Sequence, residues 1–552
     1  MKRRPAPVKN PALARTIGEM ILRAADTRPD FHFMNYFTPG GRLRRVSWAR
    51  AMPQMAAIAA WWDAHGIQSG RRVCCITPNS PGMFVWEFAA MGTGRISAPL
   101  YGRTRPEEMR RLLPGLNPAA VLVEDAPVKT AVAALLGARV RVVTLAELDE
   151  IMEGSAPVEP FRKAVRRVRP DEVALIQHTS GTSGDMKGVM LTHRNLMSEQ
   201  AAFTRIWDIP DGSRFLSYLP WHHSFGGIFE RVTALARGAA ITLEPSNGKD
   251  VRALLRTWER VRPTHFFSVP KMYVKLMSAA RRSPRARKIL FHRDLRLLFT
   301  AGAPLPSECT RYFEGRGAAI MEGWGLTETS PTVTLTRLDE PRIHTIVGHP
   351  IPGVRVRISP EGEILVKGPN VMKGYFRRPA LTRRAFDARG WFHTGDLGEM
   401  TPAGLRIICR KDGVFKLLNG LKVPSLPIEE ALTLSSPHIA YTVAMGQGRD
   451  HAAVLVFPEA GVLPACRRGG REIMRRLRVE IEAGLRPFVG TAWEVRAAAV
   501  ICEELSMEAG ELTPTQKIVR RTVLERFHRW EEAIYHPRRY PGMQKHILRF
   551  NK

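Results

Sequence analysis

The chain has 552 residues with 44% hydrophobic and 24% charged positions, and 83 basic against 52 acidic residues give a formal net charge of +31. The length exceeds what one compact core supports, so it predicts a large body with at least one smaller unit. No stretch approaches the roughly 20 consecutive apolar residues that span a bilayer, which excludes an integral membrane protein and leaves at most contact with a membrane surface.

The basic charge favours polyanionic partners such as ATP, coenzyme A, acidic carrier proteins, anionic lipid or nucleic acid. No RNP, zinc-finger or helix-turn-helix signature accompanies it, so we expect no nucleic-acid partner and interpret most of the charge as solvated surface. The start, MKRRPAPVKNPALART, lacks the apolar run of a secretory signal, and its prolines disfavour the helix of a transit peptide. We expect a cytoplasmic protein, with peripheral contact at the inner membrane face left open.

The cysteines show neither a CxxC pair nor an even framework. This pattern predicts thiols that are mostly packed as small apolar groups in a reducing compartment, and it indicates no metal site. They are Cys74, Cys75, Cys309, Cys409, Cys466 and Cys502.

Short apolar runs alternate with helical patterns through the first part of the chain, which predicts an α/β body. Helices are expected at 107–113 and 250–261, and the basic segment 161–170, which ends in proline, is predicted to be a surface connector. Strands are expected at 73–77, 120–124, 140–145 and 173–177.

The strongest local signal is HTSGTSGDMKG, residues 178–188, directly after an apolar strand. Its glycines let the backbone approach a polyanion, its hydroxyl groups donate to phosphate oxygens, and Lys187 adds a positive charge. The GxxGxxK spacing is not the GxxxxGK[ST] of nucleoside triphosphatases, and the following VMLTH is typical of a strand rather than a helix. This pattern predicts a different kind of phosphate loop.

HTSGTSGDMKGVMLTH resembles the signature of the adenylate-forming superfamily, which includes acyl-coenzyme A synthetases, luciferases and peptide-synthetase adenylation domains. The resemblance continues, with six motifs in sequence, as far as about Tyr535, so it covers nearly the whole chain. Ser183 and Met186 stand where the family usually has Thr and Pro, and neither change removes a donor. The resemblance implies ATP contacts from Thr179, Ser180, Gly181, Thr182, Ser183, Gly184 and Lys187.

LPWHHSFGG, residues 219–227, resembles the family's acyl-site segment. The resemblance implies that His223 lies beside the substrate carboxylate, where a histidine can orient or partly neutralise it. Gly226 and Gly227 are expected to leave room for an acyl chain.

GAP at 302–304 and EGWGLTE at 322–328 resemble the adenine-binding pair of motifs. Trp324, where the family more often has Tyr, would stack on the purine for roughly 1–3 kcal/mol. The resemblance implies that Thr327 donates to the α-phosphate and that Glu328 binds Mg²⁺. The implied adenine contacts are Gly302, Ala303, Pro304, Glu322, Gly323 and Trp324.

WFHTGD, residues 391–396, matches the ribose motif, and the ionised carboxylate of Asp396 can accept from both ribose hydroxyls. Arg410 matches a second ribose or phosphate contact, and Asp412 the hinge between two domain orientations. Gly420 matches the loop that a rotated small domain presents to the active site. Lys517 matches the C-terminal lysine that bridges carboxylate and α-phosphate.

The expected fold is α/β, with two α/β sheet subdomains and a β-rich subdomain, which begins near Gly353, forming a large body. A small mobile α+β domain is expected to follow, with strands at 440–445 and 452–457, helices at 473–485 and 518–535, and a loosely docked tail after Tyr535. We predict an adenylation domain over residues 1–411 and a mobile domain over 412–552.

The motifs predict ATP- and Mg²⁺-dependent conversion of a fatty acid to acyl-AMP and transfer of the acyl group to coenzyme A. Two related alternatives stay open: an acyl-AMP ligase that loads an acyl carrier protein, and a ligase for aryl or other carboxylic acids. An inactive enzyme scaffold that binds nucleic acid or membrane is disfavoured because every motif carboxylate and the lysine are present.

Overall fold

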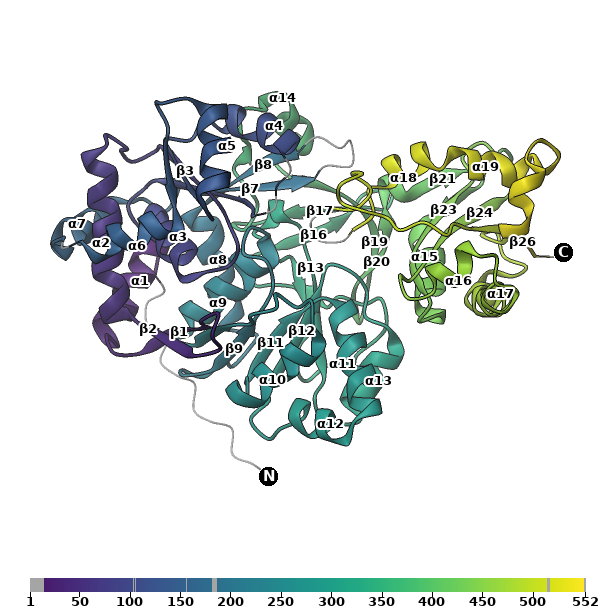
Figure 1. Ribbon diagram of the computed structural model, residues 1–552, viewed down its shortest axis with the longest axis horizontal. Helices are drawn as coiled ribbons and strands as arrows, with labels where there is room; N and C mark the ends of the chain where they lie inside the picture. The colour runs from purple at the N-terminus through teal and green to yellow at the C-terminus, as the bar shows by residue number, and fades with distance from the viewer. Residues whose placement is uncertain are drawn as a thin grey trace.

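The computed structural model describes residues 14–102, 104, 106–154, 156–180, 186–513 and 517–550. It is a mixed α/β structure with a large N-terminal body of several sheets and a smaller C-terminal lobe. The lobe projects from the body beside β19 (Phe392–Thr401) and β20 (Gly404–Arg410) (Figure 1). The predicted fold class is confirmed at this level. The mobility of the lobe and the division at residue 412 stay predictions.

The first sheet of the body has seven strands in the order β18-β8-β7-β4-β3-β5-β6. β3, β4, β5, β6 and β7 are parallel, whereas β8 returns antiparallel to β7 and carries the loop lysine. The strands are β3 (Arg72–Thr77), β4 (Ile96–Tyr101), β5 (Ala120–Val123), β6 (Arg141–Thr144), β7 (Val173–Ser180), β8 (Met186–Thr192) and β18 (Gly374–Tyr375). The four strands expected in this region all form.

The second sheet of the body has nine strands in the order β15-β14-β13-β12-β11-β9-β10-β1-β2. Its parallel centre, from β13 to β10, brings the carboxyl ends of several strands to one edge. The strands are β1 (His32–Phe37), β2 (Leu43–Ser47), β9 (Arg214–Ser217), β10 (Ala240–Leu243), β11 (His265–Ser268), β12 (Leu297–Ala301), β13 (Ile320–Trp324), β14 (Thr334–Leu335) and β15 (His349–Pro350).

Helices cover these two sheets, and the expected ones at 107–113 and 250–261 form as α4 and α10. The helices of the body are α1 (Ile17–Thr27), α2 (Trp48–Ala64), α3 (Pro81–Gly92), α4 (Pro106–Leu116), α5 (Ala126–Leu136), α6 (Leu145–Glu153), α7 (Val158–Arg167), α8 (His193–Phe203), α9 (Arg231–Ala236), α10 (Val251–Val261), α11 (Pro270–Arg282), α12 (Pro284–Leu290), α13 (Ser307–Glu314) and α14 (Pro379–Ala385). Among the described residues no helix is both long and apolar enough to cross a bilayer.

The connector expected at 161–170 is wrong, because most of that segment belongs to helix α7. Phe161 and Val165, four residues apart and therefore on one helix face, are 3% and 1% exposed and pack against the core. The arginines between and after these two residues led to the prediction of a surface loop, but they occupy the solvent face of an amphipathic helix.

A four-stranded antiparallel sheet closes the body and confirms the expected β-rich subdomain. Its order is β16-β17-β19-β20, with strands β16 (Arg355–Ile358), β17 (Glu363–Lys367), β19 (Phe392–Thr401) and β20 (Gly404–Arg410). The hairpin of β21 (Val414–Lys416) and β22 (Lys422–Pro424) follows at the start of the lobe.

The C-terminal lobe is built on a sheet with the order β23-β24-β25-β26, which has an apolar core on each face. Val454 and Val456 point into one core and Ala453 and Leu455 into the other, as strand alternation requires. Its elements are α15 (Ser425–Ser435), β23 (Ile439–Met445), β24 (Ala452–Pro458), α16 (Leu463–Arg467), α17 (Arg471–Leu485), β25 (Val495–Val500), α18 (Arg520–Arg526), α19 (His528–Tyr535) and β26 (Ile547–Arg549).

Two expectations for the lobe are wrong, and a disulfide is an addition to what was expected. The single helix at 518–535 is two helices, because Phe527 between them turns inward and packs edge-on against Phe457. The tail is not loosely docked, since β26 pairs with β25 and buries Ile547 and Leu548. The cysteines are not all free thiols: Cys466 and Cys502 form a disulfide, whereas the other four are buried and free.

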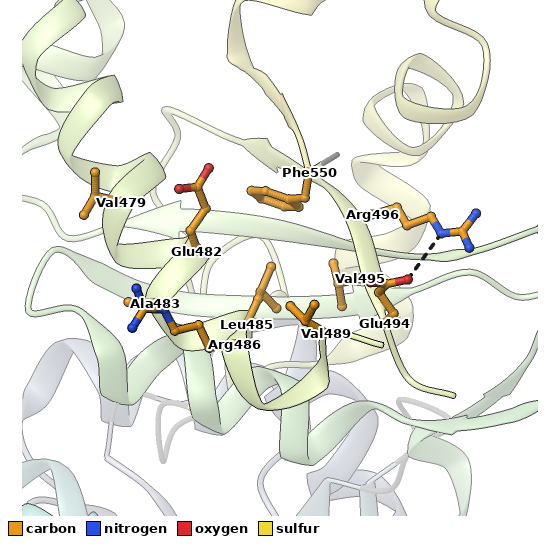
Figure 2. A pocket seen from close by; sticks show the side chains of 10 residues that line it. All are labelled: Val479, Glu482, Ala483, Leu485, Arg486, Val489, Glu494, Val495, Arg496 and Phe550. Atoms are coloured by element: carbon orange, nitrogen blue, oxygen red, sulfur yellow. Dashed lines mark ion pairs between the residues drawn. The ribbon is translucent and has the colours of Figure 1, made fainter. Parts of the chain in front are cut away.

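A pocket in the lobe lies between α17 and β25, and none of the residues that line it belongs to the predicted site (Figure 2). Leu485, Val489, Val495 and Phe550 give it an apolar lining. At its rim Arg496 Nε lies 3.8 Å from Glu494 Oε2, an exposed ion pair worth little to stability.

One buried acid in the body predicts a pH-dependent stability. Burial raises the pKa of Glu230 from its usual 4.5 to about 8, although Ser217 and Arg231 oppose the rise. The folded protein therefore keeps a proton that the unfolded chain loses near pH 4.5. Because folding then requires proton binding, the free energy of unfolding falls by at most about 1.4 kcal/mol per pH unit as the pH rises through this interval.

The variant Glu230→Gln lacks this titration, so its melting temperature relative to that of the wild type should rise between about pH 5 and about pH 8. Thermal denaturation at several pH values measures the difference. Glu472→Gln, at a side chain that is 80% exposed, should show a constant difference from wild type. A constant difference for Glu230→Gln as well would contradict the shifted pKa of Glu230.

Candidate active site

Several of the predicted residues lie at the carboxyl edge of the nine-stranded sheet. β12 and β13 are parallel neighbours, with Ala301 opposite Gly323. Gly302–Pro304 directly follow β12, and Thr327 and Glu328 follow β13, so both motifs emerge at the same edge. In open α/β sheets this edge is where ligands bind.

Asp396 is held by two side chains of the predicted site. Trp324 Nε1 donates to Asp396 Oδ2 at 3.0 Å, and Arg410 Nη1 donates to Asp396 Oδ1 at 3.0 Å. Asp396 and Arg410 face each other across β19 and β20, which fixes their approach. Burial raises the pKa of Asp396, and Arg410 and Trp324 oppose that rise. Each carboxylate oxygen keeps a second lone-pair site for a ligand hydroxyl.

Lys517 extends from the C-terminal lobe to residues of the body. A Cβ on Gly302 would lie 3.8 Å from Lys517 Nζ, and Gly302 adopts a φ of +89° that few other residues tolerate. The backbones of Thr513 and Lys517 pair, with Thr513 N donating to Lys517 O at 2.8 Å, which fixes the base of the loop that carries the lysine. Lys517 as a whole residue is exposed, but protein atoms crowd its ammonium; this desolvation lowers the pKa of Lys517, and Asp396 partly restores it.

His223 lies beside Lys517 and is held in its neutral form. Burial, together with the nearby Lys517 and His222, lowers the pKa of His223 to about 3. His223 Nδ1 accepts a hydrogen bond from the backbone N–H of Phe225 at 3.3 Å, so the ring proton resides on Nε2. The geometry thus favours the expected orienting role through an Nε2–H donor. It disfavours the expected charge neutralisation, since the neutral ring carries no positive charge near pH 7.

Gly226 and Gly227 have a packing role that the sequence analysis did not foresee. A Cβ on Gly227 would lie 1.9 Å from the carbonyl oxygen of Trp221, and one on Gly226 would lie 2.7 Å from that of Pro220. Both glycines belong to the π-helical turn Phe225–Glu230 and let it pack directly on residues 219–221. Their small size therefore serves backbone packing, and the path of an acyl chain past them stays a prediction.

Glu328 is oriented by a tyrosine that the sequence analysis did not single out. Tyr375 Oη donates to Glu328 Oε1 at 2.9 Å, and Lys187 Nζ lies 5.6 Å from the centre of the same ring. Thr327 Oγ1 lies 3.1 Å from Ser224 Oγ, which joins this group to the segment of His223. A half-buried carboxylate with one oxygen fixed and the other available is the kind of hard ligand that Mg²⁺ takes, so these residues fit that ion.

Comparison with known sequences decides the family. Residues 21–376 match the family described as AMP-binding enzyme, and residues 412–539 match the AMP-binding enzyme C-terminal domain. The chain belongs to the AMP-binding enzyme family. The resemblance inferred from the sequence motifs is thereby confirmed.

Curated relatives of this AMP-binding enzyme are named as fatty-acid ligases. Long-chain-fatty-acid–CoA ligase FadD15 of Mycobacterium bovis is 28% identical over 560 aligned residues, which cover 89% of this chain and 92% of the relative. Long-chain-fatty-acid–CoA ligase heimdall of Drosophila melanogaster is 24% identical, with 94% of this chain and 95% of the relative covered.

Two solved structures establish the fold at low sequence identity. ATP-bound MatB from Rhodopseudomonas palustris is 23% identical with a TM-score of 0.76, and the match covers 93% of this chain and 99% of that chain. O-succinylbenzoate coenzyme A synthetase (MenE) from Bacillus subtilis, in complex with ATP and magnesium ion, is 19% identical with a TM-score of 0.74, covering 91% and 98%.

The phosphate loop of this AMP-binding enzyme is described only at its two ends. Thr179 pairs with Lys187 and Ser180 with Met186 across β7 and β8, so the two strands present the loop at their ends. The predicted contacts Gly181, Thr182, Ser183 and Gly184 lie outside the described residues. The expected strand after the loop forms as β8.

Two of the predicted adenine contacts, Glu322 and Gly323, are buried and contribute to packing around β13. Glu322 is 7% exposed, accepts the backbone N–H of Leu305 at 3.4 Å, and has its pKa raised to about 7 by burial. A Cβ on Gly323 would lie 2.7 Å from Leu335 Cδ2, so this glycine lets β13 pack tightly. Ala303 is exposed and Pro304 half-buried on the segment that leaves β12.

Gly420 stands apart from the other predicted residues. It turns the β21–β22 hairpin with a φ of +88°, is exposed, and would bring a Cβ nearest to Lys416. Asp412, the predicted hinge, lies in the chain between Arg410 and Gly420. Its Oδ1 is 3.6 Å from Arg410 Nε, and both of these side chains are 45% exposed. The structure therefore brings Lys517 to the residues predicted to bind the nucleotide and leaves Gly420 at the surface.

The contact from Tyr375 to Glu328 yields a prediction. The variant Tyr375→Phe loses the hydrogen bond that orients the carboxylate, so the Mg²⁺ concentration for half-maximal activity should rise about three- to tenfold, with a smaller change at saturating Mg²⁺. Initial rates across a Mg²⁺ series measure this. The matched control is Tyr312→Phe, because Tyr312 lies outside the site and, like Tyr375, has a basic side chain over its ring. An unchanged Mg²⁺ requirement in Tyr375→Phe would contradict the positioning role.

Proposed function

We propose that this AMP-binding enzyme is an ATP- and Mg²⁺-dependent ligase that converts a fatty acid to its acyl-adenylate and transfers the acyl group to coenzyme A. The observation that carries the proposal is the position of Lys517, a lobe residue placed beside Gly302, Asp396 and His223 of the body. The long-chain fatty-acid ligases among its relatives support the substrate class.

The proposed first step joins two anions, a carboxylate and the α-phosphate of ATP, with loss of pyrophosphate. Lys517 offsets the charge that builds as the carboxylate oxygen attacks phosphorus, and Thr327 donates to the α-phosphate. Asp396 and Arg410 hold the ribose, and Trp324 presents its face to the adenine. His223 orients the carboxylate through Nε2–H, so that most of the rate gain comes from positioning.

The metal has a defined place in this proposal. Glu328, fixed by Tyr375, would hold Mg²⁺ together with phosphate oxygens, and the ion would neutralise charge on the phosphates. Lys187 would add a further positive charge from the end of the phosphate loop. No protein nucleophile is required, because the acyl-adenylate is itself the activated species.

The proposed second step needs a different part of the lobe. The thiol of coenzyme A attacks the mixed anhydride and releases AMP, and Lys517 has no task in this step. Turning the lobe about Asp412 would withdraw Lys517 and bring Gly420 to the site, which accounts for the distance of Gly420 from the nucleotide residues.

A substrate panel tests the proposed function. Purified enzyme with ATP, Mg²⁺ and coenzyme A is supplied with saturated fatty acids of increasing length, benzoate and malonate, and pyrophosphate release is measured. We expect pyrophosphate release with the fatty acids, and we expect mass spectrometry to detect the corresponding acyl-CoA. If none of the acids leads to AMP formation, the proposal is wrong. Replacing coenzyme A by an acyl carrier protein tests that acceptor, and anionic vesicles test peripheral membrane contact; both stay predictions.

A further inference from the structure

A second cluster of reactive side chains lies in the C-terminal lobe, outside the nucleotide site. Cys466, at the end of α16, is joined by a disulfide to Cys502, just after β25. His546 Nδ1 lies 3.8 Å from Cys502 Sγ, and the two sulfurs and a ring nitrogen of His546 all lie within 4.8 Å of one another. The three residues come from distant parts of the chain and none belongs to the site described above.

The two sulfurs differ in accessibility. Cys466 is fully buried in one core of the lobe, whereas Cys502 and His546 are half-buried. An external thiol or disulfide can therefore reach Cys502 first. Burial and the neighbouring Lys545 lower the pKa of His546, which leaves its ring neutral and able to accept a proton near pH 7.

The position of Cys502 connects this cluster to the lysine of the proposed function. Ile501 is the last residue held by the sheet, its N–H donating to Val456 O at 2.8 Å, and Cys502 opens the segment that leads to Lys517. Arg467 Nε, next to Cys466, donates to Cys502 O at 3.0 Å. The disulfide thus fastens the start of the 502–519 segment to α16.

A second anchor lies further along the same segment. Arg526 of α18 pairs with Glu503 at 2.8 Å and also with Glu511, which is fully buried. The start of the segment is therefore held by one covalent bond and by ion pairs. Of these, only the disulfide can be opened by a change in redox state.

We propose that Cys466 and Cys502 form a reversible thiol–disulfide pair that reacts with small disulfides such as oxidised glutathione and controls how firmly the Lys517 segment is held. In the oxidising direction, His546 accepts the proton of the Cys502 thiol, and the thiolate attacks the small disulfide to give a mixed disulfide and one released thiolate, which is then protonated. The Cys466 sulfur then attacks Cys502 Sγ and forms the intramolecular disulfide. The bond between Cys502 Sγ and the small thiol breaks, and the second small thiol leaves with the electron pair of that bond and the proton of Cys466. In sum, two protein thiols are oxidised and one small disulfide is reduced to two thiols.

The redox state is tested directly on the full-length enzyme. The protein is equilibrated in mixtures of reduced and oxidised glutathione, free thiols are trapped by alkylation, and the modified cysteines are identified by mass spectrometry. Cys466 and Cys502 should change together from both alkylated to both protected within this series. A pair that stays oxidised in reduced glutathione alone, or stays reduced in oxidised glutathione alone, would overturn the proposal.

The functional consequence is measured in the same samples. Reduction should slow acyl-adenylate formation about threefold or more, because a looser segment positions Lys517 less well, and reoxidation should restore the rate. The response should vanish in Cys466→Ser/Cys502→Ser and persist in Cys309→Ala, a buried free cysteine of the body. Equal rates in the oxidised and reduced wild type would overturn the control of Lys517, while the alkylation result is independent of the proposed function.

The part played by His546 has its own test. His546→Gln should slow disulfide formation with oxidised glutathione about tenfold near neutral pH and leave the equilibrium ratio of oxidised to reduced pair nearly unchanged, as expected for a proton acceptor. An unchanged rate would remove His546 from the exchange. If the reduced wild type instead binds one Zn²⁺ in a colorimetric chelator assay and resists oxidised glutathione, the cluster is a metal site and the redox proposal is wrong.

Discussion

Replacing Lys517 by alanine is expected to lower the rate of acyl-adenylate formation at least about a hundredfold. The same variant should form acyl-CoA from supplied acyl-AMP at close to the wild-type rate. The first step must bring a carboxylate to a phosphate, and Lys517 is the ammonium placed beside Gly302 and Asp396 where that charge develops. The second step starts from a neutral carbonyl carbon and has no need of this charge.

Two separate assays measure the effect: acyl-dependent pyrophosphate release for the first half-reaction, and release of AMP from acyl-AMP and coenzyme A for the second. Arg521→Ala serves as the matched control, because this basic side chain of the neighbouring helix is 67% exposed and paired only with Glu525 within the described chain. Equal loss of both half-reactions in Lys517→Ala would contradict the division of roles.

Much of the fold follows from local patterns in the sequence. The apolar runs that predict strands at 73–77, 120–124 and 452–457 form strands because their side chains are buried by helices on the sheet faces. The failures arise where tertiary packing decides. The basic segment 161–170 is helical because Phe161 and Val165 find a core, and the polar tail docks because β25 offers an open edge to β26.

The site divides in the same way. Motif resemblance supplies Asp396, Arg410 and Trp324 as separate residues, but not the hydrogen bonds that join them, since these depend on the register of β19 with β20 and on the end of β13. Sequence analysis did not identify Tyr375, because only the pairing of β18 with β8 places its hydroxyl within hydrogen-bond distance of Glu328. The KGYF segment that contains it carries no signal beyond a short strand.

The disulfide shows a further limit of sequence analysis. Cys466 and Cys502 are 36 residues apart, with a helix and a strand between them, so no spacing rule predicts the pair. What brings them together is the placement of α16 at the end of β25. The expectation that the cysteines are mostly packed thiols holds for the four buried ones within the body, whereas the two at a junction of elements form a disulfide that it did not foresee.

Replacing Asp396 by alanine should raise the KM for ATP at least about tenfold, because a charged acceptor that serves two ribose hydroxyls contributes roughly 1.5–3 kcal/mol per hydrogen bond. The loss also leaves Arg410 and the indole N–H of Trp324 without the partner that they share. Part of the increase therefore comes from disorder of the ribose site itself. Steady-state rates across an ATP series, at saturating fatty acid, measure the KM.

Two companion variants separate these contributions. Trp324→Phe keeps an aromatic face for the purine but cannot donate to Asp396, so it should raise the ATP KM by a smaller factor, about two- to fivefold. Glu399→Gln, on the same strand and in a half-exposed ion pair with Arg406, should leave the ATP KM at the wild-type value. If Asp396→Ala also leaves the ATP KM unchanged, the ribose does not bind at Asp396, and the nucleotide must lie elsewhere along the carboxyl edge of the nine-stranded sheet.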